Sequence, residues 1–155
     1  MIFGKLCLEY GNASKVLNEG LLENIVYALV KNDISPIRRE ILLLLSNIAC
    51  EEKVSATRIA DSDVFNIVLC IANNLASDLS ERLESMYVVC NVVTTAEPYI
   101  VTNNYPQILK TVLINLPAMK NNKRVLIVML ETILVLIKIM DQGKVIQDFE
   151  EIEGT

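Results

Sequence analysis

The stretches SPIRREILLLLSNIAC (35–50) and SERLESMYVVCNVVTT (80–95) decide the fold of this chain. A shift of about 44 residues lays one on the other and matches Asn47 with Asn91. The same shift again leads into a third apolar stretch, RVLIVMLETILVLIKIM (124–140), which has no Asn at that position. A period of this length is typical of helical repeats that stack into an array.

Each repeat is expected to contain a short, a middle and a long helix. The expected helices cover about 13–18, 21–31 and 36–50 in the first repeat, 53–60, 64–76 and 80–95 in the second, and 98–103, 106–116 and 122–138 in the third. Between the short and the middle helix stands Gly20, Asp63 or Asn104, residue types that adopt positive φ at low cost. Ser35 and Ser80 are expected to cap the first and second long helices.

The chain is therefore predicted to be all-α and to form a single array over residues 1–155. Its expected divisions are a partial repeat (1–12), three repeats (about 13–52, 53–96 and 97–140) and the start of a further repeat (141–155). In the first long helix the apolar positions form one broad face that should be buried, namely Ile37, Ile41, Leu44, Leu45 and Ile48.

Composition supports helices and excludes several functions. Hydrophobic residues make up 52% of the chain, with only five Gly and four Pro, which argues against disorder and against a β-sandwich. The net charge of −5 resides mostly in residues 141–155, and no basic stripe indicates nucleic-acid binding. Glu131 interrupts the apolar stretch 124–140, which is too short for a membrane span. We therefore expect neither a nucleic-acid nor a membrane partner.

The chain offers no set of residues for catalysis or for a metal. It contains no histidine, so a Cys/His zinc site is excluded, and it has no Gly-rich phosphate loop and no G-x-S-x-G motif. Its cysteines lie in apolar stretches, where buried reduced thiols are expected: Cys7, Cys50, Cys70 and Cys90. We expect no enzyme activity and no cofactor.

The strings REILLLLSNIA and LESMYVVCNVV resemble the third helices of the armadillo repeats in the importin-alpha family of nuclear import adaptors. VLNEGLLENIVYALVKND and the ending FEEIEGT are also similar to the carboxy-terminal half of that family. The resemblance implies a right-handed armadillo-type solenoid whose concave groove holds basic nuclear localisation signals, in the region of the minor binding site. It further implies contact with an export receptor and a place in both nucleus and cytoplasm.

The family motif has a Glu, then a Trp three residues on, then an Asn four further. Carried over, the motif implies peptide contacts from Glu40, Leu43, Ser46, Asn47, Glu84, Tyr87 and Asn91. Asparagine can pair with both the N–H and the C=O of a peptide backbone, and an aromatic ring attracts a Lys or Arg side chain. Leu43 replaces the first Trp, and Val135 replaces the third Asn, so the third repeat departs from the motif.

Two other interpretations stay open. The same Asn side chains could bond to a neighbouring turn and Tyr87 could finish the core, in a scaffold that binds protein subunits but no basic peptide. Separately, the apolar opening MIFGKLCL (1–8) looks like the end of a helix without its neighbour, with Lys5 at the Asn position. This predicts self-association through the N-terminal end.

Overall fold

The protein is all-α, as predicted. The computed structural model describes residues 17, 20–31, 34–140 and 142–153. Within these residues it contains eight α-helices and no β-strand: α3 (Leu21–Lys31), α4 (Ser35–Glu51), α5 (Lys53–Ala60), α6 (Asp63–Asn73), α7 (Leu79–Thr95), α8 (Pro98–Met119), α9 (Lys123–Ile139) and α10 (Gln142–Glu153). The N-terminal end, on which the self-association prediction rests, lies outside the described residues.

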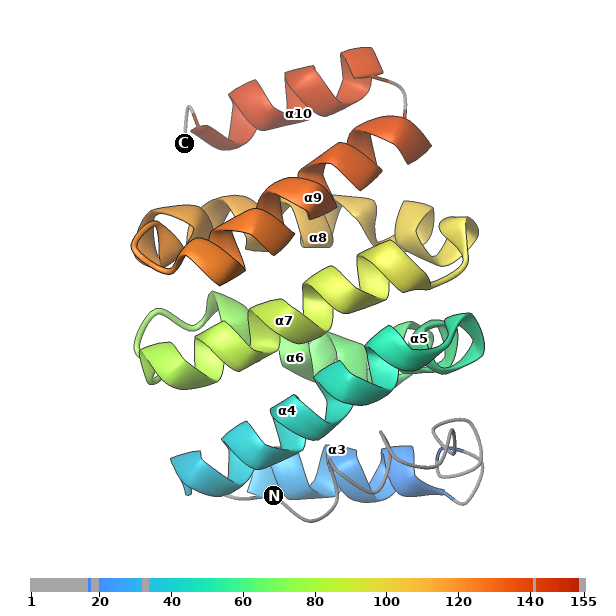
Figure 1. The fold of residues 1–155 in the computed structure, drawn as a ribbon, viewed down its shortest axis with the longest axis vertical. Helices are drawn as coiled ribbons and strands as arrows, with labels where there is room; N and C mark the ends of the chain where they lie inside the picture. Colours follow the sequence, from blue (N-terminus) through green and yellow to red (C-terminus); the bar gives the residue numbers. More distant parts are fainter. Residues whose placement is uncertain (1–16, 18–19, 32–33, 141, 154–155) are drawn as a thin grey trace.

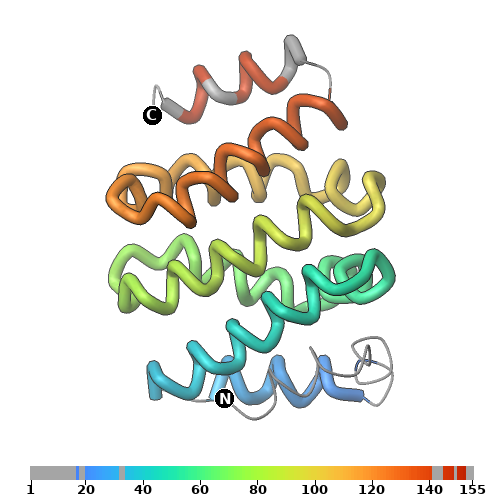
Figure 2. The backbone as a smooth tube through the Cα atoms, viewed as in Figure 1, coloured from blue at the N-terminus to red at the C-terminus, as the bar shows by residue number. Residues whose placement is uncertain are grey.

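The helices form two layers that cover each other (Figure 1). The long helices α4, α7 and α9 lie side by side in one layer and run in the same direction (Figure 2). Behind them α3, α6 and α8 form the second layer, with α3 against α6 and α6 against α8. The core lies between the layers, and α10 packs against α8 and α9 at the end of the stack.

The long helices begin and end within one or two residues of their predicted bounds, but their caps differ. The first residue of α4 is Ser35 itself, and its N-cap position is held by Ile34. In α7 the cap is Asp78, whose Oδ1 accepts a hydrogen bond of 2.9 Å from the backbone N–H of Ser80. The Ser80 hydroxyl therefore does not cap the helix, because a better acceptor stands two residues before it.

The buried face of α4 differs from the predicted one. Leu45 and Ile48 are fully buried, as expected, but Ile37 is exposed. Leu42 is fully buried although the expected face did not include it. The buried surface of α4 is wider than one apolar stripe because α7 packs against one side of the helix and α3 of the second layer packs against another.

The third unit contains one helix where two were predicted. Helix α8 runs without interruption through Asn104 and Pro106, so the predicted turn at Asn104 is wrong. Proline at position 106 removes a hydrogen bond to the carbonyl of Thr102. Both Thr102 and Pro106 are exposed, so water can satisfy that carbonyl and the helix continues.

The predicted turns before the middle helices are confirmed in one case only. Gly20 has φ of +75°, and it is the one described residue with positive φ. Asp63 is already the first residue of α6, and the chain turns at Asp61 and Ser62 with negative φ. The left-handed turn is thus a feature of the first unit alone among those described.

The described cysteines are free thiols, but their burial was wrongly predicted for two of them. Cys90 is buried, whereas Cys50 and Cys70 are exposed; Cys7 lies outside the described residues. Among the described helices, none combines the length and apolar character that a bilayer span requires. The described part of the chain also holds no cluster of three Cys, Asp or Glu side chains suited to a metal ion.

Candidate peptide-binding surface

The residues predicted to bind a peptide all lie on α4 and α7, the two helices in closest contact. On α4 they are Glu40, Leu43, Ser46 and Asn47, and on α7 they are Glu84, Tyr87 and Asn91. Within each helix the spacing of three and four residues places the Glu, the apolar or aromatic residue and the Asn on one face. All six of these are exposed or half-buried, so they form the solvent-facing strip of α4 and α7.

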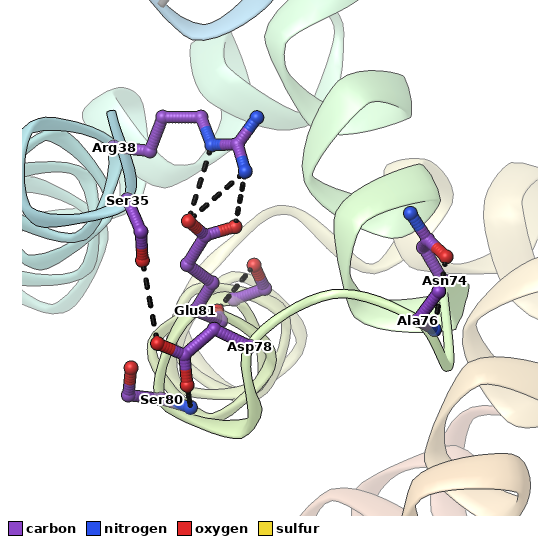
Figure 3. A network of polar contacts seen from close by, with 8 residues as sticks. Ser35, Arg38, Asn74, Ala76, Asp78, Ser80 and Glu81 are labelled. Carbon is purple, nitrogen blue, oxygen red and sulfur yellow. Dashed lines mark hydrogen bonds and ion pairs between the residues drawn. The ribbon is translucent and has the colours of Figure 1, made fainter. Parts of the chain in front are cut away.

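Polar contacts near the start of both helices fix how α4 lies on α7 (Figure 3). The Arg38 guanidinium donates to both carboxylate oxygens of Glu81, with Nη2 2.8 Å from Oε2 and 3.0 Å from Oε1. The Ser35 hydroxyl donates to Oδ2 of Asp78 at 3.4 Å. Each pair joins residues 43 positions apart in the sequence. The strip is thus set by inter-helix contacts rather than by a flexible loop.

The side chain of Asn91 is part of the α4–α7 interface. Its Nδ2 donates to the backbone carbonyl and to the hydroxyl of Ser46, both at 3.0 Å. Ser46 is buried, so its hydroxyl cannot face a ligand. Because both contacts use the amide nitrogen, Asn91 keeps only Oδ1 for a partner outside the chain. Asn47, the counterpart of Asn91 on α4, is half-buried.

The carboxylates of the strip lie close enough to influence one another. Burial raises the pKa of the half-buried Glu84; the nearby Glu40 adds to this shift and Arg39 opposes it. Arg39 also lowers the pKa of Asp78, although the main cause there is the hydrogen bond from the Ser80 backbone. Arg39 is not among the residues predicted from the sequence to lie at this surface. Its signal was its position directly before the motif Glu.

Tyr87 lies along the strip from Glu84 and toward α9. Burial raises the pKa of its phenol, Glu84 raises it further and Arg124 of α9 opposes the shift. Tyr87 is half-buried, so part of the residue remains exposed to solvent. Arg124, like Arg39, is a cation that was not predicted at this surface, because it lies 37 residues beyond Tyr87 in the sequence.

The third long helix does not repeat the polar strip. Val135, at the position of Asn47 and Asn91, is half-buried, and the exposed Glu131 is its polar neighbour. On α4, Leu43 is 37% exposed and presents an aliphatic surface where the motif has an aromatic ring. The acidic and aromatic groups of the surface are therefore Glu40 of α4 and Glu84 and Tyr87 of α7.

A cavity of about 310 Å³ lies elsewhere, between α8 and α10. It is lined by Pro106, Leu109, Lys110, Asp148, Glu151 and Ile152. Beside it the buried Tyr105 has a pKa raised to about 12, by burial first and then by the nearby carboxylate of Asp148. The phenol stays protonated at neutral pH, and α10 packs against α8 at this point.

The groups gathered on α4 and α7 are suited to recognition of another chain. Two carboxylates, an aromatic ring and amide oxygens can accept hydrogen bonds and attract cations. Asp78, Glu81 and Asn91, which fix the two helices, already have partners within the protein. Neither the known protein-family models nor the curated protein sequences give a match to this chain.

Proposed function

We propose that this chain is part of a nuclear import adaptor of the importin-alpha type, which binds a basic nuclear localisation signal along α4 and α7. The observation that carries the proposal is the half-buried carboxylate of Glu84, next to Glu40 and beside the Tyr87 ring. A Lys or Arg head at this point would offset the cost of holding Glu84 ionised in a partly buried place. The ring would pack against the aliphatic stem.

The proposal includes an armadillo-type right-handed solenoid as the architecture. It is supported by the parallel order of α4, α7 and α9 (Figure 1) and by contacts between residues 43 to 45 positions apart. Repeats of this kind bury their apolar faces against their neighbours and leave one helix face free for an extended ligand. Exchange between nucleus and cytoplasm, with an export receptor as second partner, belongs to the same proposal.

The expected affinity is modest. A cation–π contact with Tyr87 contributes about 0.5–2 kcal/mol, and Leu43 supplies no second one. The cations Arg39 and Arg124 lie near the same carboxylate and ring and compete with a basic ligand. The surface therefore selects a ligand with several basic residues in sequence rather than a single Lys or Arg.

The test is fluorescence anisotropy with a labelled peptide that carries five consecutive Lys and Arg residues. Glu84→Gln and Tyr87→Leu should each weaken binding, by about 5–30-fold for a loss of about 1–2 kcal/mol. Glu23→Gln on α3 removes the same charge in the other layer and is the matched control. Binding that is equal in all four proteins would show general electrostatic attraction and contradict the proposal.

A second candidate is a scaffold that joins protein subunits and binds no basic peptide. The Asn91–Ser46 contact favours it, because an Asn that bonds to the neighbouring helix serves the interface between repeats. Absence of peptide binding at millimolar concentration, with the fold intact by circular dichroism, would favour this scaffold over the adaptor.

A further inference from the structure

The exposed side of α9 carries three apolar side chains in one row. Ile127, Leu130 and Leu134 follow a spacing of three and four residues, so they lie on one face of the helix. Leu130 is 47% exposed and Leu134 is 56% exposed. We call Ile127, Leu130 and Leu134 the α9 ledge. It lies on a helix whose opposite side, including Val125 and Met129, is fully buried.

The earlier long helices show what covers this face. At a shift of 44 residues, Leu130 corresponds to Met86 of α7 and to Leu42 of α4, and both are fully buried. Leu134 corresponds in the same way to Cys90 and Ser46.

These two counterparts are covered by the next long helix of the layer. Ser46 accepts hydrogen bonds from Asn91 of α7. Cys90 is only 1% exposed and lies next to Thr132 of α9. The exposed face of α9 therefore corresponds to the face of α4 that packs against α7 and to the face of α7 that packs against α9.

We propose that the α9 ledge is a docking site for an amphipathic α-helix that lies parallel to α9, as α7 lies on α4. The partner helix presents small and branched apolar residues to Leu130 and Leu134, as α9 presents Thr132 to Cys90. The exposed Arg124 and Lys138 stand near the two ends of α9, with Glu131 between them. Carboxylates near both ends of the partner helix complement this order of charges.

The same charges argue against a second copy of α9 as the occupant. In a two-fold antiparallel pair centred on Glu131, each Arg124 faces a Lys138 and the two Glu131 carboxylates face each other. Like charges placed opposite one another at an interface disfavour association. A parallel helix with acidic ends has no such conflict. This inference concerns a surface other than the α4–α7 strip and does not depend on the binding of basic peptides.

The test uses a designed 17-residue helix with a lactam staple on its outer face, because short helices are marginal in water. It carries Val, Met, Thr and Leu at the spacing of Val125, Met129, Thr132 and Leu136, with Glu near both ends. Binding to the whole chain is measured by fluorescence anisotropy. The double change Leu130→Gln/Leu134→Gln should weaken binding at least about tenfold, since two exposed apolar contacts are lost.

The control is Val30→Gln/Val54→Gln, which alters two exposed apolar side chains on α3 and α5 and should leave binding within about twofold. A version of the peptide with Lys in place of the terminal Glu residues should bind less tightly. Absence of binding by the wild-type chain, or equal binding by both double variants, would overturn the proposal. So would concentration-dependent self-association, measured by sedimentation, that Leu130→Gln/Leu134→Gln removes.

Discussion

Arg38 of α4 and Glu81 of α7 form a bidentate ion pair in which the two side chains differ in solvent exposure (Figure 3). Nη2 of Arg38 lies 2.8 Å from Oε2 of Glu81, the Arg38 side chain is 25% exposed and the Glu81 side chain is fully buried. The pair joins the two helices that carry the proposed peptide surface. Because only the carboxylate is fully enclosed, loss of each partner should have a different cost.

Arg38→Met should lower the free energy of unfolding by about 3–5 kcal/mol, since it leaves a buried carboxylate without a counter-charge. Glu81→Gln should cost less, about 1–3 kcal/mol, because Arg38 can turn toward water. The double change Arg38→Met/Glu81→Met should recover much of the loss. Urea unfolding followed by circular dichroism measures the order of these three values.

Lys53→Met is the control for this series, because Lys53 and Glu97 form an exposed pair 3.6 Å apart. Exposed pairs contribute about 0–1 kcal/mol, so this change should have little effect. Equal losses for Arg38→Met and Glu81→Gln would mean that the burial of Glu81 does not determine the energetics of the pair.

Arg82 provides a second test of how buried charge is held. Its Nη2 donates to Oδ1 of Asn115 at 2.6 Å and its Nε donates to the carbonyl of Ala72 at 3.3 Å, near the C-terminus of α6. The negative end of a helix favours a cation there. Asn115→Leu should therefore cost about 1–3 kcal/mol in urea unfolding, because it leaves the Arg82 guanidinium short of an acceptor.

Asn122→Leu is a less demanding change at the N-cap of α9, where the loss should be about 1 kcal/mol. If Asn115→Leu lowered the free energy of unfolding no more than Asn122→Leu, the buried Arg82–Asn115 hydrogen bond would contribute no more to stability than a helix cap.

The sequence predicted the long helices well, because their apolar runs and the 44-residue period point to the same segments. It failed at α8, where Pro106 was read as the start of a helix. Proline is favoured at the first position of a helix, but it is also tolerated, at a cost, inside a helix whose affected carbonyl reaches water; the pattern of a sequence does not distinguish the two cases. Tyr105, fully buried next to Pro106, is among the side chains that keep this region packed.

The polar strip was predicted as a set of residues, but its electrostatics were not. Arg38, Glu81 and Arg82 interrupt apolar patterns and would ordinarily be assigned to solvent. Only the pairing of α4 with α7 shows that Arg38 and Glu81 belong together. The same holds for Asn91, because its engagement with Ser46 depends on how two helices distant in sequence lie against each other.

Glu84 makes stability depend on pH in a direction opposite to that of most carboxylates. Its pKa is raised above 4.5 in the folded protein, so the folded state holds this proton more tightly than the unfolded state. The contribution is therefore favourable at low pH and is lost as the pH rises through the folded pKa. Glu84→Gln should raise the melting temperature slightly at pH 7 and have no such effect at pH 4.

The control for this change is Glu23→Gln, which lies on α3 and is exposed. It should not raise the melting temperature at either pH value, because an ionised Glu in the first turn of α3 stabilises that helix. A Glu84→Gln protein that melts lower than wild type at pH 7 would mean that the ionised carboxylate has a stabilising partner, and Arg39 is the nearest candidate.

Asn91 and Ser46 can be tested as a pair. At a shift of 44 residues this pair corresponds to Val135 and Cys90, which suggests an apolar alternative for the same contact. Asn91→Val alone should cost about 0.5–1.5 kcal/mol through loss of the hydrogen bonds to Ser46. The double change Asn91→Val/Ser46→Cys should recover most of the free energy of unfolding that Asn91→Val loses. A simple sum of the single effects would show that the two side chains are not coupled.

Leu43→Trp tests whether this position faces a peptide. Leu43 is 37% exposed on the strip that also holds Glu40 and Asn47, so a larger ring can extend toward solvent without disturbing the core. An indole there adds a cation–π contact of about 1–2 kcal/mol and should tighten binding of a basic peptide about 5–30-fold. Leu75→Trp, in the exposed loop between α6 and α7, is the control and should leave the affinity as it is. Equal affinities for Leu43→Trp and wild type would place the peptide elsewhere and favour the scaffold over the import adaptor.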